Sequence, residues 1–274
     1  MSPRRYNAGR LGASRPAPSS RAPCHCCYRI VRPRSEKALR VGVTPVPAGE
    51  LVAYLAPELA KQGIEIKIVS FSDYIQPDLA LAAGELDANL YQNVPFMKQF
   101  NLDHGSKLVA VTRAYLPAMG IYPGRSKSLA ALPANAIIAL PNDPTNLGRG
   151  LLLLQSAGLV TLNSDSSAAI TVRDIAANPK HIQLRELEAA QLPRALQDVD
   201  AAVINANFAL DAGLSPTRDA LFHEKTDSVH ANVLAVNSGG ERDRRVVALA
   251  RALTSEESRR FIEQRYKGAV FPSF

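Results

Sequence analysis

The chain lacks tryptophan, and its three cysteines all fall within the first 27 of its 274 residues. The rest of the chain therefore needs no disulfide, and its folding is indifferent to the redox compartment. No apolar run approaches the roughly 18 residues that a membrane-spanning helix needs. Apolar residues make up 46% and charged residues 21%, which is typical of a soluble globular protein. A chain of this length forms one large domain or two modest ones.

The signatures of common enzyme classes are also missing. The sequence contains no G-x-S-x-G, H-E-x-x-H, G-x-G-x-x-G or P-loop motif. The four histidines after the N-terminal region are scattered and predict no metal set: they are His104, His181, His223 and His230. If the chain were an enzyme acting on a small carboxylate substrate, its candidate acidic residues would be Asp87, Asp143, Glu186 and Glu188. No nucleophile–base pair accompanies them, so we expect no cofactor and keep an enzyme only as an alternative.

Positive charge is concentrated at the N-terminus. Residues 1–38 hold nine arginines and lysines against one acid, so they carry +8 and leave −1 of the net +7 for the rest. A nearly neutral body predicts no nucleic-acid surface. Five prolines and few large apolar residues predict that residues 1–37 form a disordered basic leader. Its C-H-C-C cluster (Cys24, Cys26 and Cys27 with His25) lacks the paired spacing of zinc modules.

The leader also lacks the features of a targeting or DNA-reading segment. It has no apolar stretch of about 7–15 residues, so no signal peptide is visible. No aliphatic residue precedes Pro23 and Cys24 in the way that a lipoprotein cleavage site (lipobox) requires. Prolines throughout exclude a helix-turn-helix, which argues against a ligand-sensing transcriptional regulator.

From Ala38 onward, strand patterns alternate with helix patterns. Strands are predicted over residues 39–44, 64–69, 86–91, 107–112, 137–140, 201–204 and 231–236. Helices are predicted over residues 50–62, 74–83, 94–104, 243–252 and 256–266. Such alternation predicts an α/β fold with a mostly parallel sheet.

The pattern restarts after a turn-rich junction, Tyr122–Ser126. We therefore predict two α/β lobes, the first made of residues 38–121 and 229–274 and the second of residues 122–228. Small ligands bind at the carboxyl ends of strands in such sheets, so the cleft between the lobes is the expected site.

One segment, Ala136–Gln155, has the pattern of a site for a small anion. An apolar strand is followed by Asp143 at a helix N-cap position and Pro144 at the first helical position. Asn146 and Arg149 then share one face of the first two turns. Free N–H groups, the helix dipole and a guanidinium together favour a carboxylate or phosphate. The alternative is an ordinary capped helix whose arginine is solvated or pairs with a structural acid.

Five segments resemble one known family. PNDPTNLGR (Pro141–Arg149), SFSDY (Ser70–Tyr74) and ELDANLYQNVPF (Glu85–Phe96) are similar to stretches of the NlpA/MetQ family of methionine-binding lipoproteins. ELEAAQLPRAL (Glu186–Leu196) and AAVINANFA (Ala201–Ala209) strengthen the resemblance. It spans about residues 38–270, in family order and at family-like spacing.

The resemblance implies a periplasmic-binding-protein fold of type II, with two α/β lobes around a ligand cleft. It implies the substrate-binding component of an ABC importer, which captures L- or D-methionine or a close relative by lobe closure. The expected hinges lie near Ile121–Gly124 and Thr226–Ala231. The expected partners are a membrane permease with its ATPase, and the periplasmic face of the inner membrane through a lipid anchor. A decayed copy that stays in the cytoplasm is the alternative suggested by the N-terminus.

The resemblance also implies roles for individual residues. Arg149 corresponds to the arginine that pairs with the ligand's α-carboxylate, beside Asn146. The remaining expected contacts are Asn205 and Asn232 at the amino-acid head group, and Tyr74, Tyr91 and Phe96 around the thioether. A thioether gains about 0.3–1.5 kcal/mol from each aromatic contact. The alternative for Tyr91 and Phe96 is ordinary core packing.

One position departs from the family pattern. Family members commonly have a histidine where this chain has Asn93. Asparagine is shorter and cannot become cationic, so we expect the polarity at the sulfur end of the pocket to differ. Methionine of either hand, a methionine derivative or a short methionine-containing peptide therefore all stay open as ligands.

Overall fold

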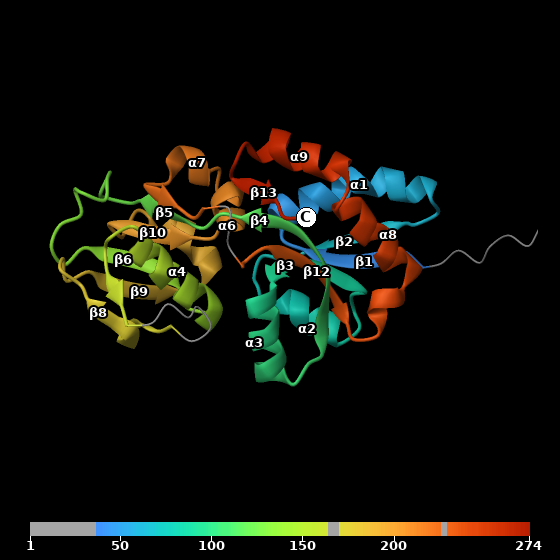
Figure 1. Cartoon of the computed structure of the whole chain (residues 1–274), viewed down its shortest axis with the longest axis horizontal. Helices are drawn as coiled ribbons and strands as arrows, with labels where there is room; N and C mark the ends of the chain where they lie inside the picture. The colour runs from blue at the N-terminus through green and yellow to red at the C-terminus, as the bar shows by residue number, and fades with distance from the viewer. Residues whose placement is uncertain (1–36, 164–169, 226–228) are drawn as a thin grey trace, which may run out of the picture. The chain divides into compact units, whose positions relative to one another are not determined.

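The computed structural model describes residues 37–163, 170–225 and 229–274 (Figure 1). The predicted leader up to residue 36, with its three cysteines, and residues 226–228 of the second predicted hinge lie outside them. The described residues belong to one compact unit. None of their helices is long and apolar enough to cross a membrane.

The first sheet has six strands, with β1 and its two parallel neighbours at one side. In spatial order they are β13 (Val270–Pro272), β4 (Leu108–Pro117), β12 (Asn232–Asn237), β3 (Ala88–Asn93), β1 (Leu39–Val43) and β2 (Ile66–Ser70). Five helices accompany it: α1 (Glu50–Lys61), α2 (Gln76–Ala82), α3 (Val94–His104), α8 (Arg244–Leu253) and α9 (Glu256–Tyr266).

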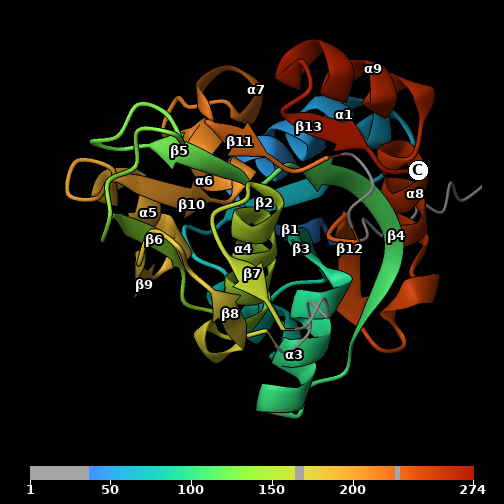
Figure 2. The same cartoon turned by 60° about the vertical axis from the view of Figure 1, so that its left-hand side comes forward.

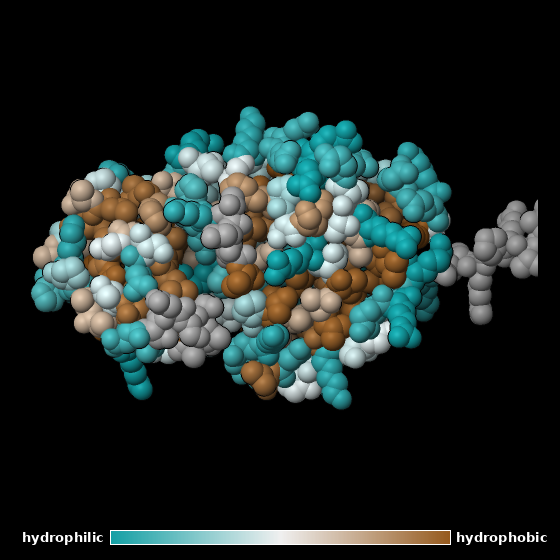
Figure 3. Space-filling view, viewed as in Figure 1, coloured by the Kyte–Doolittle hydropathy of each residue, from teal (hydrophilic) through white to brown (hydrophobic). Residues whose placement is uncertain are grey.

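These helices cover both faces of the first sheet (Figure 1). Apolar residues of α1, α8 and α9 join one core cluster with Leu39, Val41 and Val43 of β1. Leu81 of α2 and Met97 of α3 belong to a separate cluster. Hydrophilic side chains lie over the outer faces of α8 and α9 (Figure 3), as expected for amphipathic helices on a sheet.

The second sheet has five strands and lies beside the first (Figures 1 and 2). In spatial order they are β11 (Phe222–His223), β5 (Gly120–Pro123), β10 (Ala201–Ile204), β6 (Ile137–Pro141) and β9 (Gln183–Leu187). Its helices are α4 (Pro144–Ser156), α5 (Leu192–Ala195), α6 (Ala206–Asp211) and α7 (Pro216–Asp219). A small ribbon pairs β7 (Thr161–Leu162) with β8 (Ile175–Ala177). Single helical turns lie at Pro45–Gly49, Val172–Asp174, Ala189–Gln191 and Gly240–Arg242.

The prediction of a mostly parallel sheet is wrong. Of the ten strand pairings within the described residues, six are antiparallel. Parallel neighbours need a crossover helix, which β1, β2, β3, β6, β9 and β10 have. The strands β5 and β12 enter their sheets directly from the other sheet and run antiparallel to their neighbours.

The first crossing between the sheets is short. It consists of Ala118–Met119, between the end of β4 and the start of β5. In the predicted hinge near Ile121–Gly124, residues Ile121–Pro123 pair with β10 and β11 inside the second sheet, next to this crossing, and the hinge stays a prediction. The predicted turn-rich junction is wrong for Tyr122 and Pro123 for the same reason. The lobe limits (residues 38–121 with 229–274, and residues 122–228) stay a prediction.

Candidate functional site

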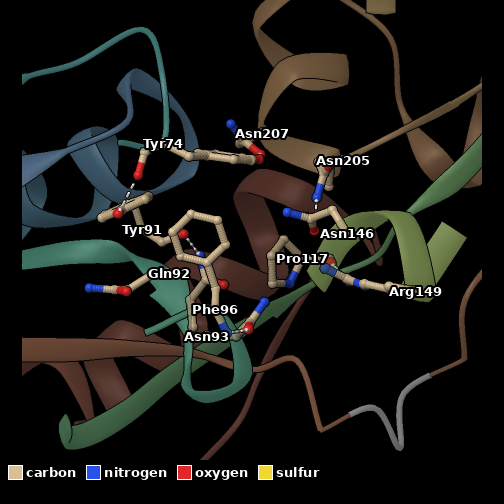
Figure 4. Close-up of a pocket in the computed structure, with 12 residues that line it drawn as sticks. Tyr74, Tyr91, Gln92, Asn93, Phe96, Pro117, Asn146, Arg149, Asn205 and Asn207 are labelled. Atoms are coloured by element: carbon tan, nitrogen blue, oxygen red, sulfur yellow. Dashed lines mark hydrogen bonds between the residues drawn. The ribbon is translucent and has the colours of Figure 1, made fainter. Parts of the chain in front are cut away.

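A pocket lies between elements of the two sheets (Figure 4). All eight predicted site residues line it: Tyr74, Tyr91, Asn93, Phe96, Asn146, Arg149, Asn205 and Asn232. Sequence reasoning missed its other lining residues, which are Gln92, Pro117, Ala206 and Asn207. The ligand contacts of these residues stay predictions.

The first turn of α4 forms one wall of the pocket. As predicted, Asp143 is the N-cap and Pro144 is the first helical residue. The Asp143 carboxylate accepts the backbone N–H of Asn146 at 2.9 Å and both of its oxygens accept the Asn146 side-chain amide, at 2.9 and 3.0 Å. Burial raises the pKa of Asp143, although these hydrogen bonds and Arg149 favour the charged form. The cap holds the Asn146 side chain in a fixed direction.

Asn205 completes this wall from the second sheet. It directly follows the buried strand β10, and its Nδ2 donates to Asn146 Oδ1 at 2.8 Å (Figure 4). Its own Oδ1 is buried and has no hydrogen-bond partner among the described residues. A buried amide oxygen without a partner is uncommon, and a donor from a bound molecule would satisfy it.

Arg149 is almost completely buried, with 3% of its side chain exposed. Its Nε and Nη2 donate to the two carboxylate oxygens of Glu224 at 2.8 and 2.5 Å, and Nη2 also donates to the Pro117 carbonyl at 2.9 Å. Arg149 therefore has the acid partner that the alternative expects, and it also lines the pocket, so its contact with a ligand stays a prediction. Sequence reasoning missed Glu224, because the two residues are 75 positions apart and only the tertiary fold brings them together.

Glu224 is held as firmly as its partner. Its Oε2 also accepts the Met119 backbone N–H at 3.0 Å, from the first crossing between the sheets. Burial alone raises the pKa of Glu224, but the charge and hydrogen bonds of Arg149 outweigh it, so the pKa lies below its usual value. The pair is therefore an ion pair at neutral pH.

Three aromatic side chains form the opposite wall. The ring centroid of Tyr74 lies 5.8 Å from that of Tyr91 and 5.8 Å from that of Phe96. The centroids of Tyr91 and Phe96 are 6.2 Å apart. The Tyr74 hydroxyl donates to Asn207 Oδ1 at 2.6 Å, and the Tyr91 hydroxyl donates to the Tyr74 carbonyl at 2.6 Å. Both hydroxyls are thus occupied. Tyr91 and Phe96 are buried as the core alternative expects, yet they also line the pocket.

The side chains of the remaining predicted residues are fixed by hydrogen bonds to the backbone. Asn93 is the N-cap of α3, and its Oδ1 accepts the Phe96 N–H at 2.9 Å. Asn232, in β12, donates to the Tyr91 carbonyl at 2.7 Å. Asn93 therefore also has a structural function, which the sequence comparison with a family histidine did not indicate.

A buried carboxyl group lies behind the aromatic wall. Asp78 Oδ1 accepts Nδ2 of Asn89 at 2.7 Å and Nε2 of Gln92 at 2.5 Å, while the Gln92 amide points away from Arg149 (Figure 4). Asp78 is fully buried, and burial raises its pKa from 3.8 to about 6. The protonated form is therefore favoured by folding.

The raised pKa of Asp78 makes a prediction about stability. The unfolded state loses this proton near pH 3.8 and the folded state near pH 6, so the free energy of unfolding falls as pH rises between these values. From pH 5 to pH 7 we expect a loss of about 1 kcal/mol from this group. In Asp78→Asn this part of the pH dependence disappears in urea unfolding curves. The exposed Asp211→Asn is the control, and an unchanged pH profile in Asp78→Asn contradicts the assignment.

The carboxylates considered for an enzyme do not line the pocket. Asp87 forms an ion pair with Arg40 at 2.9 Å, and neither Glu186, Glu188 nor Asp143 is among the lining residues. Within the described ranges, no group of three histidine, cysteine, aspartate or glutamate residues could hold a metal ion.

Comparison with known proteins extends this picture. The model of the NlpA lipoprotein family matches residues 39–274. The D-methionine-binding lipoprotein MetQ of Escherichia coli (strain K12) is 40% identical over 223 residues, which cover 80% of this chain and 82% of that protein.

Two solved structures are similar along their whole length. One is a nutrient-binding protein from Burkholderia cenocepacia bound to methionine, with 41% identity and a TM-score of 0.82 over 86% of this chain and 100% of that one. The other is a periplasmic substrate-binding protein of an ABC transporter from Coxiella burnetii, with 39% identity and a TM-score of 0.82 over 86% and 100% of the two chains.

These matches confirm the predicted fold, an α/β fold of the periplasmic-binding-protein type with two sheets around a pocket. They extend over both sheets, because the family model begins at β1 and ends at the last residue. The match to the family model and the identity of about 40% lead to one conclusion: this chain belongs to the NlpA lipoprotein family.

Proposed function

We propose that this chain is the substrate-binding component of an ABC importer and that it captures methionine, in L or D form, or a closely related amino acid or short peptide. The observation that carries the proposal is the pocket itself. It combines a guanidinium and amides on one wall with three aromatic rings on the other. An amino acid with an apolar, sulfur-containing side chain has the complementary chemistry.

The polar wall suits an amino-acid head group. Arg149 Nη1 has no hydrogen-bond partner among the described residues and is the donor we assign to the α-carboxylate. The unsatisfied Asn205 Oδ1 is the acceptor we assign to the ammonium, with Asn232 nearby in the lining. Asn146 lies between them and is fixed by Asp143 and Asn205.

The aromatic wall suits the thioether. Tyr74, Tyr91 and Phe96 present ring surfaces whose hydroxyls are already occupied, and sulfur–ring contacts contribute about 0.3–1.5 kcal/mol each. The relatives support this assignment, since one similar structure is bound to methionine and one similar lipoprotein is a D-methionine-binding protein.

The mechanism we propose is capture by closure. The pocket is lined from both sheets, so a ligand makes its full set of contacts only when the two sheets approach each other. Tyr74 already bridges the sheets through Asn207. The partners we propose are a permease with its ATPase, at the periplasmic face of a membrane where a lipid anchor holds the protein, by analogy with the lipoproteins of the family. We propose no catalytic step and no cofactor.

Calorimetry tests the proposal directly. The purified full chain, freed of bound ligand by unfolding and refolding, is titrated with L-methionine, D-methionine and L-leucine. We expect saturable heat with a methionine isomer and at least about tenfold weaker binding of leucine, which lacks the sulfur. Leucine binding as tightly as methionine, or no heat with either methionine isomer, contradicts the proposal.

A further inference from the structure

Arg149 is the only lining residue of the pocket, among the described residues, whose side chain carries a positive charge. The positive charge of Arg149 is paired with a carboxylate. Both carboxylate oxygens of Glu224 accept from the guanidinium, and both partners are largely buried, at 3% and 14% exposure. A bidentate pair of this kind is fixed in geometry and has no net charge.

His230, a second basic side chain that acts on Glu224, does not add a positive charge at neutral pH. His230 is buried, and burial followed by the nearby charge of Arg149 lowers its pKa to about 4, so it is neutral at pH 7. Asp143, at the start of α4, adds a further carboxyl group within the field of Arg149. The polar wall therefore has donors and acceptors but no excess of positive charge.

We propose that Glu224 determines the charge selectivity of the site: by neutralising Arg149 it favours a net-neutral zwitterionic amino acid over a net-anionic ligand of the same shape. The inference rests on the proposed function and deepens it. A lone buried guanidinium attracts any carboxylate, whereas a neutral ion pair offers an anion one hydrogen bond without a compensating net charge. Only a ligand that brings its own ammonium adds no further negative charge to the closed pocket.

Glu224 also positions the guanidinium. Its carboxylate accepts hydrogen bonds from Nε and Nη2 of Arg149, and the Pro117 carbonyl also accepts from Nη2. Nη1 is therefore left for a ligand. Met119 donates to the same carboxylate from the first crossing between the sheets, so Glu224 connects the ligand-facing arginine to that crossing. Neutralisation and positioning are separable, because a positioning defect weakens every carboxylate ligand alike.

The experiment compares two ligands of the same shape that differ at one group and in net charge. One is L-methionine, and the other is 2-hydroxy-4-(methylthio)butanoate, in which a hydroxyl replaces the ammonium so that the molecule carries a net charge of about −1 at pH 7. Dissociation constants of the full chain are measured by calorimetry for both. The readout is the preference, defined as the dissociation constant of the hydroxy acid divided by that of methionine.

In Glu224→Gln we expect this preference to fall by about tenfold or more, because the glutamine keeps an oxygen acceptor but no longer cancels the charge of Arg149. Glu224→Ala removes the same charge with a different side chain and serves where the glutamine variant does not fold. The exposed Glu263→Gln is the matched control and should leave the preference unchanged.

The outcomes are distinct. A preference that is unchanged or increased while both ligands weaken overturns the proposal and leaves Glu224 as a positioning residue only. A wild-type chain that binds neither ligand contradicts the proposed function itself. Thermal unfolding of each variant without ligand establishes that the compared proteins are folded.

Discussion

Arg149→Ala should weaken methionine binding by at least about 2 kcal/mol, which is roughly a 30-fold increase in dissociation constant. The substitution removes the donor that we assign to the ligand's carboxylate. It also removes the charge partner of Glu224 and leaves that carboxylate in a largely buried position. Breaking a buried ion pair from one side is costly, at about 3–5 kcal/mol of folding free energy.

Two measurements separate these effects. Calorimetry at a temperature where the unliganded variant is folded gives the loss of affinity, and urea unfolding without ligand gives the loss of stability. Arg125→Ala is the control, because this arginine also pairs with an acid, Asp200, but its side chain is 54% exposed and does not line the pocket. An unchanged dissociation constant in Arg149→Ala would mean that the arginine is a structural residue and that the carboxylate binds elsewhere.

Gly124→Ala should lower the free energy of unfolding by about 3 kcal/mol or more. Gly124 directly follows β5, and a Cβ at this position would lie 2.2 Å from the Val199 carbonyl oxygen and 2.7 Å from that of Leu196. Both neighbours are backbone atoms, so no side-chain rotation relieves the overlap. The backbone hydrogen bond from Gly124 N–H to the Asp200 carbonyl, at 3.1 Å, would be strained as well.

Gly150→Ala is the matched control for this prediction. Gly150 is a buried glycine inside α4, and its added Cβ would make ordinary contacts with side chains, at 3.4 Å from Val203 Cγ1 and 3.9 Å from Leu140. Alanine favours a helix interior over glycine by about 1 kcal/mol, so this variant should be neutral or more stable. Equal unfolding midpoints for the two variants would show that the segment after β5 moves freely, contrary to the packing described here.

Local patterns in the sequence were sufficient for the parts of the site that neighbours in the chain determine. Capping is local, so Asp143 and Pro144 at the start of α4 were predictable, and the helix begins where expected. The helix α3 also begins and ends at its predicted residues. Strand ends were less accurate, because β4 continues to Pro117 only through its pairing with β12 and β13.

The grouping of the eight predicted residues came from the family resemblance rather than from spacing. Tyr74 and Asn205 are far apart in the chain, and nothing in their local sequence indicates that they line one pocket. Gln92 and Asn207 lie beside predicted residues and were missed, since alternation along a strand or turn does not say which neighbour faces a cavity. Their hydrogen bonds, to Asp78 and from Tyr74, depend on packing between elements.

The sequence by itself determined the family, the alternation of strands and helices, and the capped helix with Arg149, because each of these is encoded in contiguous residues. Only the tertiary structure decided the partner of that arginine. The carboxylate of Glu224 reaches the guanidinium because β11 pairs with β5 and delivers the next residue to the crossing at Met119. The neutralisation of the Arg149 charge thus depends on two residues 75 positions apart, and no local sequence pattern predicts it.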